Sequence, residues 1–295
     1  AEDARAAMSQ RTVAAELLAY APGEGTAALL QQLVQRQTEP ELSEPLIRAW
    51  CAVGGDAPNQ YLLELLPSAS PRLQRTILPL IASSPARLAL LAEQLDAGGI
   101  TAGQLGASEL SKLVESASGQ TKSQLQTHLA GIVNSDRSQV VERYKDCLAL
   151  ESDVGRGMEL FRKHCASCHR VGEIGVDVGP NISDSRTKLP LELLTAILDP
   201  NRAIDNNYFR FIVLTEEGRV IEGIIAEETG EALIIRGQDD RRELIRRDDI
   251  ATMKATGVSL MPEGLEAQLD PQSMADLIAF IKGWRYIDGA IPVQQ

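Results

Sequence analysis

The chain is poor in the residues that mark several classes of protein. Of its 295 residues four are cysteine and three are histidine, and aromatic side chains make up 4%. Four cysteines are too few for a disulfide scaffold of this length. No apolar run reaches the roughly 18 residues that a membrane-spanning helix needs. The sequence therefore predicts neither a small disulfide-rich protein nor a transmembrane helix.

Positive charge is scarce as well. The 41 acidic residues outnumber the 29 lysines and arginines, which gives a formal net charge of −12 and a pI near 4.8. Both halves of the chain are acidic, so the average hides no basic tail. Because a protein that binds nucleic acid needs a basic face, we expect no nucleic-acid partner.

An apolar signal segment is missing from the start of the chain, which opens with the polar residues Ala1-Glu2-Asp3. A chain whose leader peptide has been removed is expected to open in the same way. The opening residues alone therefore leave the compartment undecided.

The length suggests two domains, since domains average roughly 150 residues. Residues 1–148 consist of apolar segments at helical spacing, separated by proline and glycine. Starts such as Ser70-Pro71 and Ser84-Pro85 are typical of helix N-termini. The pattern predicts an all-helical module, either a short HEAT-like solenoid or an irregular bundle, because no clean repeat period is found. No motif in this module indicates a function.

Residues 149–295 follow a different pattern. Helical spacing over 154–165 is followed by a glycine-rich loop, and aromatic and β-branched segments then predict an antiparallel β insertion at about 207–255. Its strands are expected at 208–215, 219–226, 232–236, 243–246 and 250–254. A last helix is expected over 271–284, with Asp270 as its N-cap. The predicted fold class is mainly α, with this small antiparallel insertion in the C-terminal domain.

The motif that carries chemistry is Cys165-Ala166-Ser167-Cys168-His169. Two cysteines three positions apart, with histidine directly after the second, form the attachment signature of c-type haem. The two thiols bond to the two vinyl groups of one haem, and the imidazole becomes the proximal ligand of the iron. The spacing therefore predicts one covalent haem c, anchored by Cys165 and Cys168 and ligated by His169.

The cysteine pair has two other interpretations. A zinc half-site needs a second cysteine or histidine pair, which the sequence does not offer elsewhere. A thioredoxin-like redox pair belongs at a junction from strand to helix, whereas this motif follows a predicted helix. The context favours haem over both.

The second axial ligand of the iron is sought among the remaining histidines and the methionines. The candidates are His128, His164, Met8, Met158, Met253, Met261 and Met274. Met261 lies in a non-helical stretch before the last helix, where Pro262 stiffens the backbone. Its position favours Met261. Met253, in a predicted strand, is the next candidate, and an open or histidine-ligated site is the third alternative.

Residues 150–295 resemble a class I cytochrome c domain. The matching pieces are Arg156-Gly157, Phe161, the haem motif, Gly179-Pro180-Asn181 and Leu260-Met261-Pro262. In that family the first and last helices cross, with a small residue against an aromatic one, which implies Gly157 and Phe161 against Phe280 or Trp284. The family's proline after the haem motif accepts, through its carbonyl, a hydrogen bond from the haem histidine. The resemblance implies this role for Pro180.

From about Pro85 onwards the chain also resembles the haem-binding domain abundant in planctomycetes and verrucomicrobia. The matching pieces are Arg143-Tyr144, Asp153-Val154-Gly155-Arg156-Gly157, Asp199-Pro200-Asn201, the segment 212–223 and the segment 257–265. In that family a β insertion lies between haem motif and methionine, and the domain often follows helical repeats and a dehydrogenase-like module. The resemblance implies a dehydrogenase-type redox partner. Because covalent haem attachment takes place outside the cytoplasm, it also implies a periplasmic or otherwise extracytoplasmic location.

A haem with histidine and thioether ligands has both axial positions filled, which favours single-electron transfer. We therefore expect an electron carrier rather than an enzyme. Two alternatives stay open. One is a haem-based sensor or gas-binding protein with a labile or open sixth site. The other is an accessory fragment that accepts electrons from a catalytic subunit.

Two further features allow two readings each, and a third has one. Cys51 and Cys147 either form a disulfide or are separate buried thiols. A basic cluster next to the haem motif either offsets the haem propionates or the surrounding acid, or forms a docking rim for an acidic redox partner. This cluster consists of Arg162, Lys163, His164 and Arg170. The mixed charges of 239–243 are interpreted as the solvated face of a hairpin.

Overall fold

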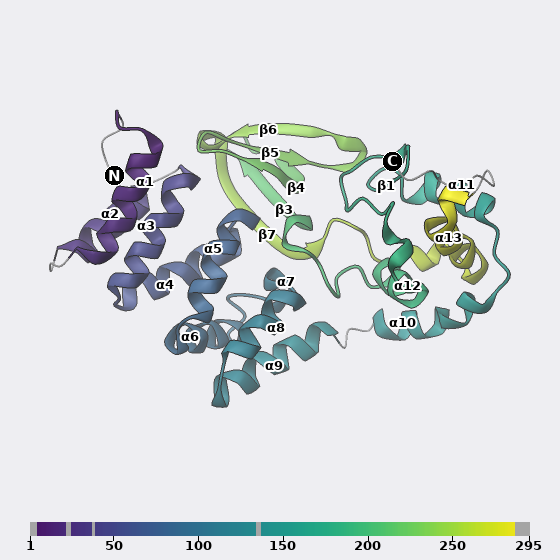
Figure 1. Cartoon of the computed structure of the whole chain (residues 1–295), viewed down its shortest axis with the longest axis horizontal. Helices are drawn as coiled ribbons and strands as arrows, with labels where there is room; N and C mark the ends of the chain where they lie inside the picture. Colours follow the sequence, from purple (N-terminus) through teal and green to yellow (C-terminus); the bar gives the residue numbers. More distant parts are fainter. Residues whose placement is uncertain (1–4, 22–24, 37–38, 134–136, 287–295) are drawn as a thin grey trace.

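The computed structural model describes residues 5–21, 25–36, 39–133 and 137–286. Over these residues the fold is mainly α, with a small antiparallel sheet in its C-terminal part, as predicted (Figure 1). The N-terminal helical module contains α1 (Met8–Leu17), α2 (Thr26–Arg36), α3 (Pro40–Val53), α4 (Asp56–Leu65), α5 (Pro71–Ala82), α6 (Pro85–Asp96), α7 (Ala102–Leu105), α8 (Ala107–Ser116) and α9 (Gly119–Val133). The C-terminal part contains α10 (Arg137–Tyr144), α11 (Val154–His164), α12 (Pro190–Leu198) and α13 (Pro271–Gly283).

The predicted start signals of α5 and α6 are confirmed. The hydroxyl of Ser70 accepts a hydrogen bond from the backbone N–H of Leu73 at 3.3 Å, and a proline opens each helix. Ser84 caps α6 in the same way. Capping by serine before proline satisfies a backbone donor that the first turn leaves free.

No single helix in the described ranges is long and apolar enough to cross a membrane. The pair α5 and α6 meets the length and composition together, but the two helices are bent by 115° at the break between them. Their apolar faces, including Ile77, Ile81 and Leu88, lie in the core of the helical module. Burial in that core accounts for their apolar composition.

Helices α11 and α13 form the framework of the C-terminal part. They cross at Gly157, where an added Cβ would lie 2.0 Å from the carbonyl oxygen of Asp276 and 2.8 Å from the Cβ of Phe280. One turn further, the rings of Phe161 and Phe280 pack with their centroids 5.4 Å apart. The absence of a side chain at Gly157 is what lets the two backbones approach. Trp284 lies elsewhere, against Gly172.

A five-stranded antiparallel sheet is inserted between α12 and α13. Its strands are β3 (Phe209–Thr215), β4 (Val220–Glu228), β5 (Ala232–Arg236), β6 (Arg242–Arg246) and β7 (Ile250–Ser259), in the order β6-β5-β4-β3-β7. A short pair, β1 (Arg170–Val171) and β2 (Ile174–Gly175), follows the haem motif. Alternation along β3 buries Phe209, Phe211 and Val213 on one face. This face has an apolar core of its own.

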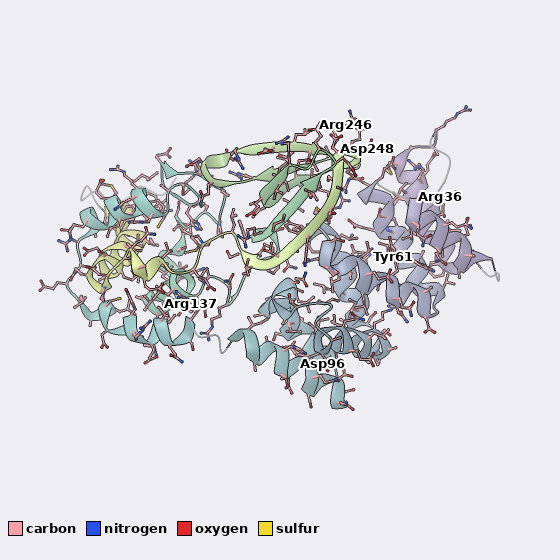
Figure 2. The ribbon with its side chains drawn as sticks, turned by 180° about the vertical axis from the view of Figure 1, so that it is seen from behind. Arg36, Tyr61, Asp96, Arg137, Arg246 and Asp248 are labelled. Atoms are coloured by element: carbon pink, nitrogen blue, oxygen red, sulfur yellow. The ribbon has the colours of Figure 1, made fainter. Side chains whose placement is uncertain are left out.

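The apolar residues gather in three cores. The first lies in the helical module. The second is formed by residues of α10, α11, α12 and α13 around the haem motif, and the third belongs to the sheet. The boundary predicted between residues 148 and 149 rests on composition. By packing, Val140 and Val141 of α10 already contribute to the second core. Arg137, labelled in Figure 2 at the start of α10, forms a two-pronged ion pair with Glu266 at 2.7 Å.

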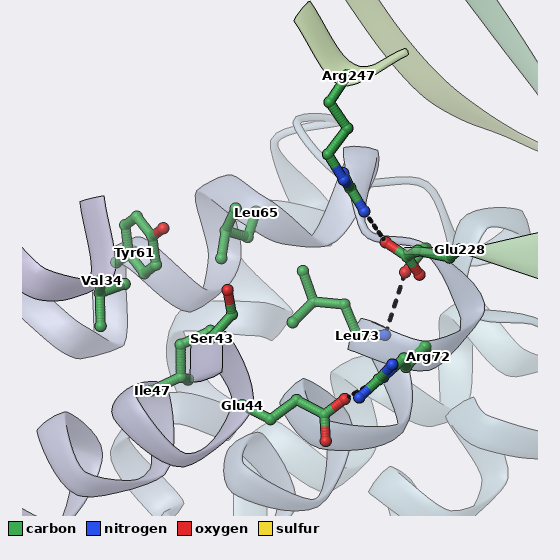
Figure 3. A pocket seen from close by; sticks show the side chains of 11 residues that line it. Val34, Ser43, Glu44, Ile47, Tyr61, Leu65, Arg72, Leu73, Glu228 and Arg247 are labelled. Carbon is green, nitrogen blue, oxygen red and sulfur yellow. Dashed lines mark hydrogen bonds and ion pairs between the residues drawn. The ribbon is translucent and has the colours of Figure 1, made fainter. Parts of the chain in front are cut away.

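The sheet lies between the helical module and the haem-motif part (Figure 1). Strand β7 contacts α7, and the end of the sheet near Arg246 and Asp248, where the chain leaves β6, lies beside the first helices (Figure 2). A cavity of about 300 Å³ lies at this second contact (Figure 3). Its charged side chains are paired on each side of it: Arg247 binds Glu228 at 2.6 Å on the sheet side, and Arg72 binds Glu44 at 2.6 Å on the helical side. The predicted haem residues do not line this cavity.

Candidate functional site

The haem motif forms a tight turn at the end of α11. The N–H of Cys165 still donates to the carbonyl of Phe161, which closes the helix. The N–H groups of Cys168 and His169 then donate to the carbonyl of Cys165 at 3.0 and 2.8 Å. One turn therefore brings together the three side chains that the sequence predicts as haem anchors and proximal ligand.

The imidazole of His169 is oriented by the residue that the resemblance implied. Its Nδ1 lies 2.8 Å from the carbonyl oxygen of Pro180. A carbonyl only accepts hydrogen bonds, so Nδ1 carries the proton and Nε2 keeps its lone pair. Burial lowers the pKa of the ring, although the bond to Pro180 opposes this. The result is a neutral imidazole with one nitrogen free to ligate a metal.

Two glycines shape the cradle around this histidine. A Cβ at Gly179 would lie 2.6 Å from Cε1 of His169, inside the ring's contact distance. A Cβ at Gly175 would lie 2.1 Å from the carbonyl oxygen of His169, and its φ of +89° is in the left-handed region. Sequence reasoning marked this stretch as a glycine-rich loop but gave neither glycine a role.

The environment of the thiols bears on the redox alternative. Burial raises the pKa of the Cys165 thiol to about 12, and the neighbouring Cys168 adds to the shift. Burial also raises the pKa of Cys168. A reactive redox pair needs a lowered thiol pKa, so this environment does not suit one. Within the described ranges no three His, Cys, Asp or Glu side chains are grouped to hold a metal ion.

The structure separates the two leading methionine candidates. Met261 packs against the same core as Cys165 and Ala166 of the haem motif. Met253 packs against the core of the sheet, where its strand pairs it with Val213. Met261 is therefore the one that shares a core with the haem motif.

The remaining candidates for the distal ligand lie in two places, the helical module and the neighbourhood of the haem motif. Met8 packs against the helical module, Met158 is half-buried at the second core, and Met274 is fully buried in it. The Nε2 of His128 lies 2.7 Å from Asp96 in the helical module. Burial lowers the pKa of His164, the residue before Cys165.

The segment around Met261 is held by a residue to which the sequence gave no role. Asn201 accepts a hydrogen bond from the N–H of Ser259 at 2.7 Å and donates to the carboxylate of Glu263. The hydroxyl of Ser259 in turn accepts from the N–H of Met261 at 3.1 Å. Asn201 thus bridges both sides of Met261 from the end of α12. Its tripeptide, Asp199-Pro200-Asn201, was one of the matched segments, which was the available signal.

The turn between β5 and β6 differs from the prediction of a purely solvated hairpin face. The N–H of Asp239 donates to the carbonyl of Ser167 at 2.8 Å, so this turn docks on the haem motif. Asp239 and Asp240 both have positive φ, and the carboxylate of Asp240 binds Arg236 and Arg242. The aspartate side chains tolerate this backbone better than most. The β insertion therefore contacts the attachment turn as well as the Met261 segment.

The basic cluster beside the motif is partly paired with acid. Arg162 binds Glu159 at 2.7 Å, and Arg170 binds Asp177 at 2.6 Å. These pairs agree with the reading in which the cluster offsets nearby acid. The docking of a partner at this cluster stays a prediction.

Cys51 and Cys147 are both buried and unpaired. Cys51 lies in the core of the helical module and Cys147 in the core around the haem motif. Of the two readings left open, the structure has the separate buried thiols.

These residues fit a haem c. The anchoring thiols, the neutral imidazole with Nδ1 bound to a carbonyl, and the space left by Gly179 beside the ring are what covalent attachment and iron ligation require. The protein-family model described as Cytochrome c matches residues 154–213, from the start of α11 into β3. No curated protein matches the chain. The chain therefore contains a cytochrome c domain, whose cofactor is a covalently bound haem c. Met261 lies outside the matched residues.

Proposed function

We propose that this cytochrome c domain is a one-electron carrier with His169 and Met261 as its axial ligands. When bound, the haem c supplies an iron that alternates between Fe(II) and Fe(III). The observation that carries the proposal is that Met261 packs against the same apolar core as Cys165 and Ala166, whereas Met253 packs against the core of the sheet. A thioether ligand stabilises the ferrous state relative to a second imidazole and leaves both axial positions filled.

The protein residues have defined parts in this role. Cys165 and Cys168 retain the cofactor through thioether bonds, so it is not lost between electron transfers. The Pro180 carbonyl holds the proton on Nδ1 of His169 and fixes the ring's orientation. The apolar residues of the surrounding core exclude water, which keeps the ligands in place when the charge of the site changes. No side chain has to give up or take up a proton.

We further propose the finer affiliation that the sequence suggests. The β insertion and the Met261 segment support membership of the haem-binding domains of planctomycete and verrucomicrobial type, with HEAT-like helices before the domain. The partner would be a dehydrogenase-type redox protein, and the location extracytoplasmic, because that is where haem is attached covalently. A pull-down from periplasmic extract followed by reduction of the haem tests the partner.

The test of the ligation is a visible spectrum of the purified protein, first ferric, then reduced with dithionite, then under carbon monoxide. Met261 ligation predicts a far-red methionine-to-iron charge-transfer band in the ferric protein and no spectral change with carbon monoxide. A missing band with rapid carbon monoxide binding would contradict the proposal. The sensor or gas-binding reading, with an open sixth site, would then replace it.

A further inference from the structure

The short helix α7 touches the strand that leads to Met261. A Cβ on Gly103 would lie 2.7 Å from the carbonyl oxygen of Gly257 in β7, and a Cβ on Gly257 would lie 2.8 Å from the backbone nitrogen of Gln104. The φ of Gly257 is +78°, in the left-handed region. The two backbones therefore meet with no side chain between them. Even alanine would force them apart.

The side chain of Gln104 fixes how α7 sits on the strand. It is 4% exposed, and its Nε2 donates to the carbonyl of Ala255 in β7 at 3.2 Å. Its Oε1 accepts from the N–H of Thr101 at 2.9 Å and from the Thr101 hydroxyl at 3.2 Å. Because a buried amide is costly to leave without partners, this side chain allows one arrangement of helix and strand.

The contact falls on a β-bulge just before the methionine. Strand β7 pairs Ala255 with Phe211 and Ser259 with Phe209, so residues 256–258 face a single residue of β3. A bulge bends a strand and changes the direction in which it continues. Here the strand continues to Ser259, whose hydroxyl accepts from the N–H of Met261. The direction of the chain toward Met261 is therefore set where α7 presses on β7.

Few residues separate the contact from the methionine. Gly257 and Met261 are four residues apart, a span of at most about 14 Å for a fully extended chain. Asn201 holds the far side of this segment through Ser259 and Glu263. A displacement of the bulge would thus be passed to Met261 or would break the Asn201 contacts.

We propose that the helical module, through α7, positions Met261 as the distal ligand, with Gly103 and Gln104 as its positioning residues. This inference rests on the His169–Met261 ligation proposed above. A neutral thioether has no charge to draw it to its place, so its position depends on the segment that carries it. The helical module, in which the sequence shows no motif, then has a definite part in the haem site.

The experiment compares Gly103→Ala and Gln104→Met with the wild-type holoprotein. Gly131→Ala is the matched control, because Gly131 is also helical and an added Cβ there meets nothing within 4 Å. Met261→Ala gives the signal of a lost ligand. The measurements are the ferric far-red band, the rate of carbon monoxide binding after reduction, and hydrogen exchange of residues 256–264. Gln104→Met keeps the side-chain volume and covers the case in which Gly103→Ala does not fold.

We expect both variants to lose a large part of the far-red band and to bind carbon monoxide about fivefold faster or more, Gly103→Ala by its clash with Gly257 and Gln104→Met by the loss of its hydrogen bonds. Exchange over 256–264 should rise, while Gly131→Ala stays at the wild-type level. A wild-type band and rate in folded Gly103→Ala and Gln104→Met would overturn the inference, provided that Met261→Ala abolishes the band. A band that survives Met261→Ala would instead overturn the proposed ligation. Exchange then decides the positioning role alone, and unchanged exchange over 256–264 would refute it.

Discussion

The two predicted ligands of the haem are held in different ways. The His169 ring is oriented within one short segment, by Pro180 eleven residues further along and by the space at Gly179. Met261 depends on distant residues: its neighbour Ser259 binds Asn201, 58 residues away, and β7 binds Gln104 across 151 residues. The contacts of the proximal side lie within one short segment, whereas those of the distal side join segments far apart in the sequence. Substitutions on the distal side should therefore change ligation while attachment of the haem persists.

The largest effect is expected when both cysteine anchors on the proximal side are removed. The double substitution Cys165→Ala and Cys168→Ala removes both thioether anchors, so no haem should stay with the chain after denaturing electrophoresis and haem staining. The matched control is Cys51→Ala with Cys147→Ala, which removes two buried thiols from other places in the cores. Retained haem in the first variant, or its loss in the second, would contradict the assigned anchors.

A smaller but still large effect is expected at the helix crossing beneath the site. Gly157→Ala places a Cβ 2.0 Å from a backbone carbonyl of α13, and overpacking of this kind should lower the free energy of unfolding by about 3 kcal/mol. Urea denaturation followed by circular dichroism measures it. Gly131→Ala is the control and should stabilise slightly, since alanine is the better helix former. Equal stability of the two variants would show that α11 and α13 do not cross at Gly157.

The buried carboxylate at the same crossing gives a pH-dependent effect. Burial would raise the pKa of Asp276, but hydrogen bonds from Arg156, the N–H of Asp153 and Gln272 outweigh it and lower the pKa. A lowered carboxyl pKa adds stability above the unfolded value near 4, and this stability is lost as the pH falls below about 4.

Asp276→Asn should therefore lower the free energy of unfolding by about 2 kcal/mol at pH 7, and by less at pH 3. Thermal melts of the two proteins across this pH range measure the difference. A difference that stays constant with pH would mean that the ionised carboxylate is not what stabilises the crossing.

The smallest effect is expected from a substitution that weakens only the distal segment around Met261. Asn201→Ala removes hydrogen bonds on both sides of Met261, worth about 1 kcal/mol to the segment. The reduced protein should then bind carbon monoxide about fivefold faster, at unchanged haem content. Asn181→Ala is the matched control, because Asn181 accepts a local hydrogen bond from Ser183 near the proximal side. Equal rates for both variants would show that Asn201 does not hold the distal segment.

The sequence predicted what is encoded over short distances. The haem motif, the end of α11 and the strands β3 to β6 lie at or within two residues of their expected places, because alternation and turn residues act locally. Strand β7 continues to Ser259 rather than ending near 254, because its last residues pair across a bulge. An irregular register interrupts the alternation of buried and exposed residues from which a strand is predicted.

The residues that sequence reasoning missed owe their roles to contacts between distant segments. Gly103 and Gln104 lie in a four-residue helix of ordinary composition, and nothing local indicates that β7 lies against it. The role of Asn201 depends on its hydrogen bond from Ser259, which only the tertiary structure brings beside it. The helical spacing of residues 1–148 predicted the class of the module but not its contact with the site.

The central claim is that Met261 rather than Met253 completes the haem site. Its most direct test is the ferric far-red spectrum of Met261→Ala beside that of Met253→Ala, each at equal haem content. The structure places Met261 in the core of the haem motif and Met253 in the core of the sheet. We predict that Met261→Ala abolishes the charge-transfer band and lowers the reduction potential, while Met253→Ala retains the band. A band that survives in Met261→Ala and disappears in Met253→Ala would contradict the account.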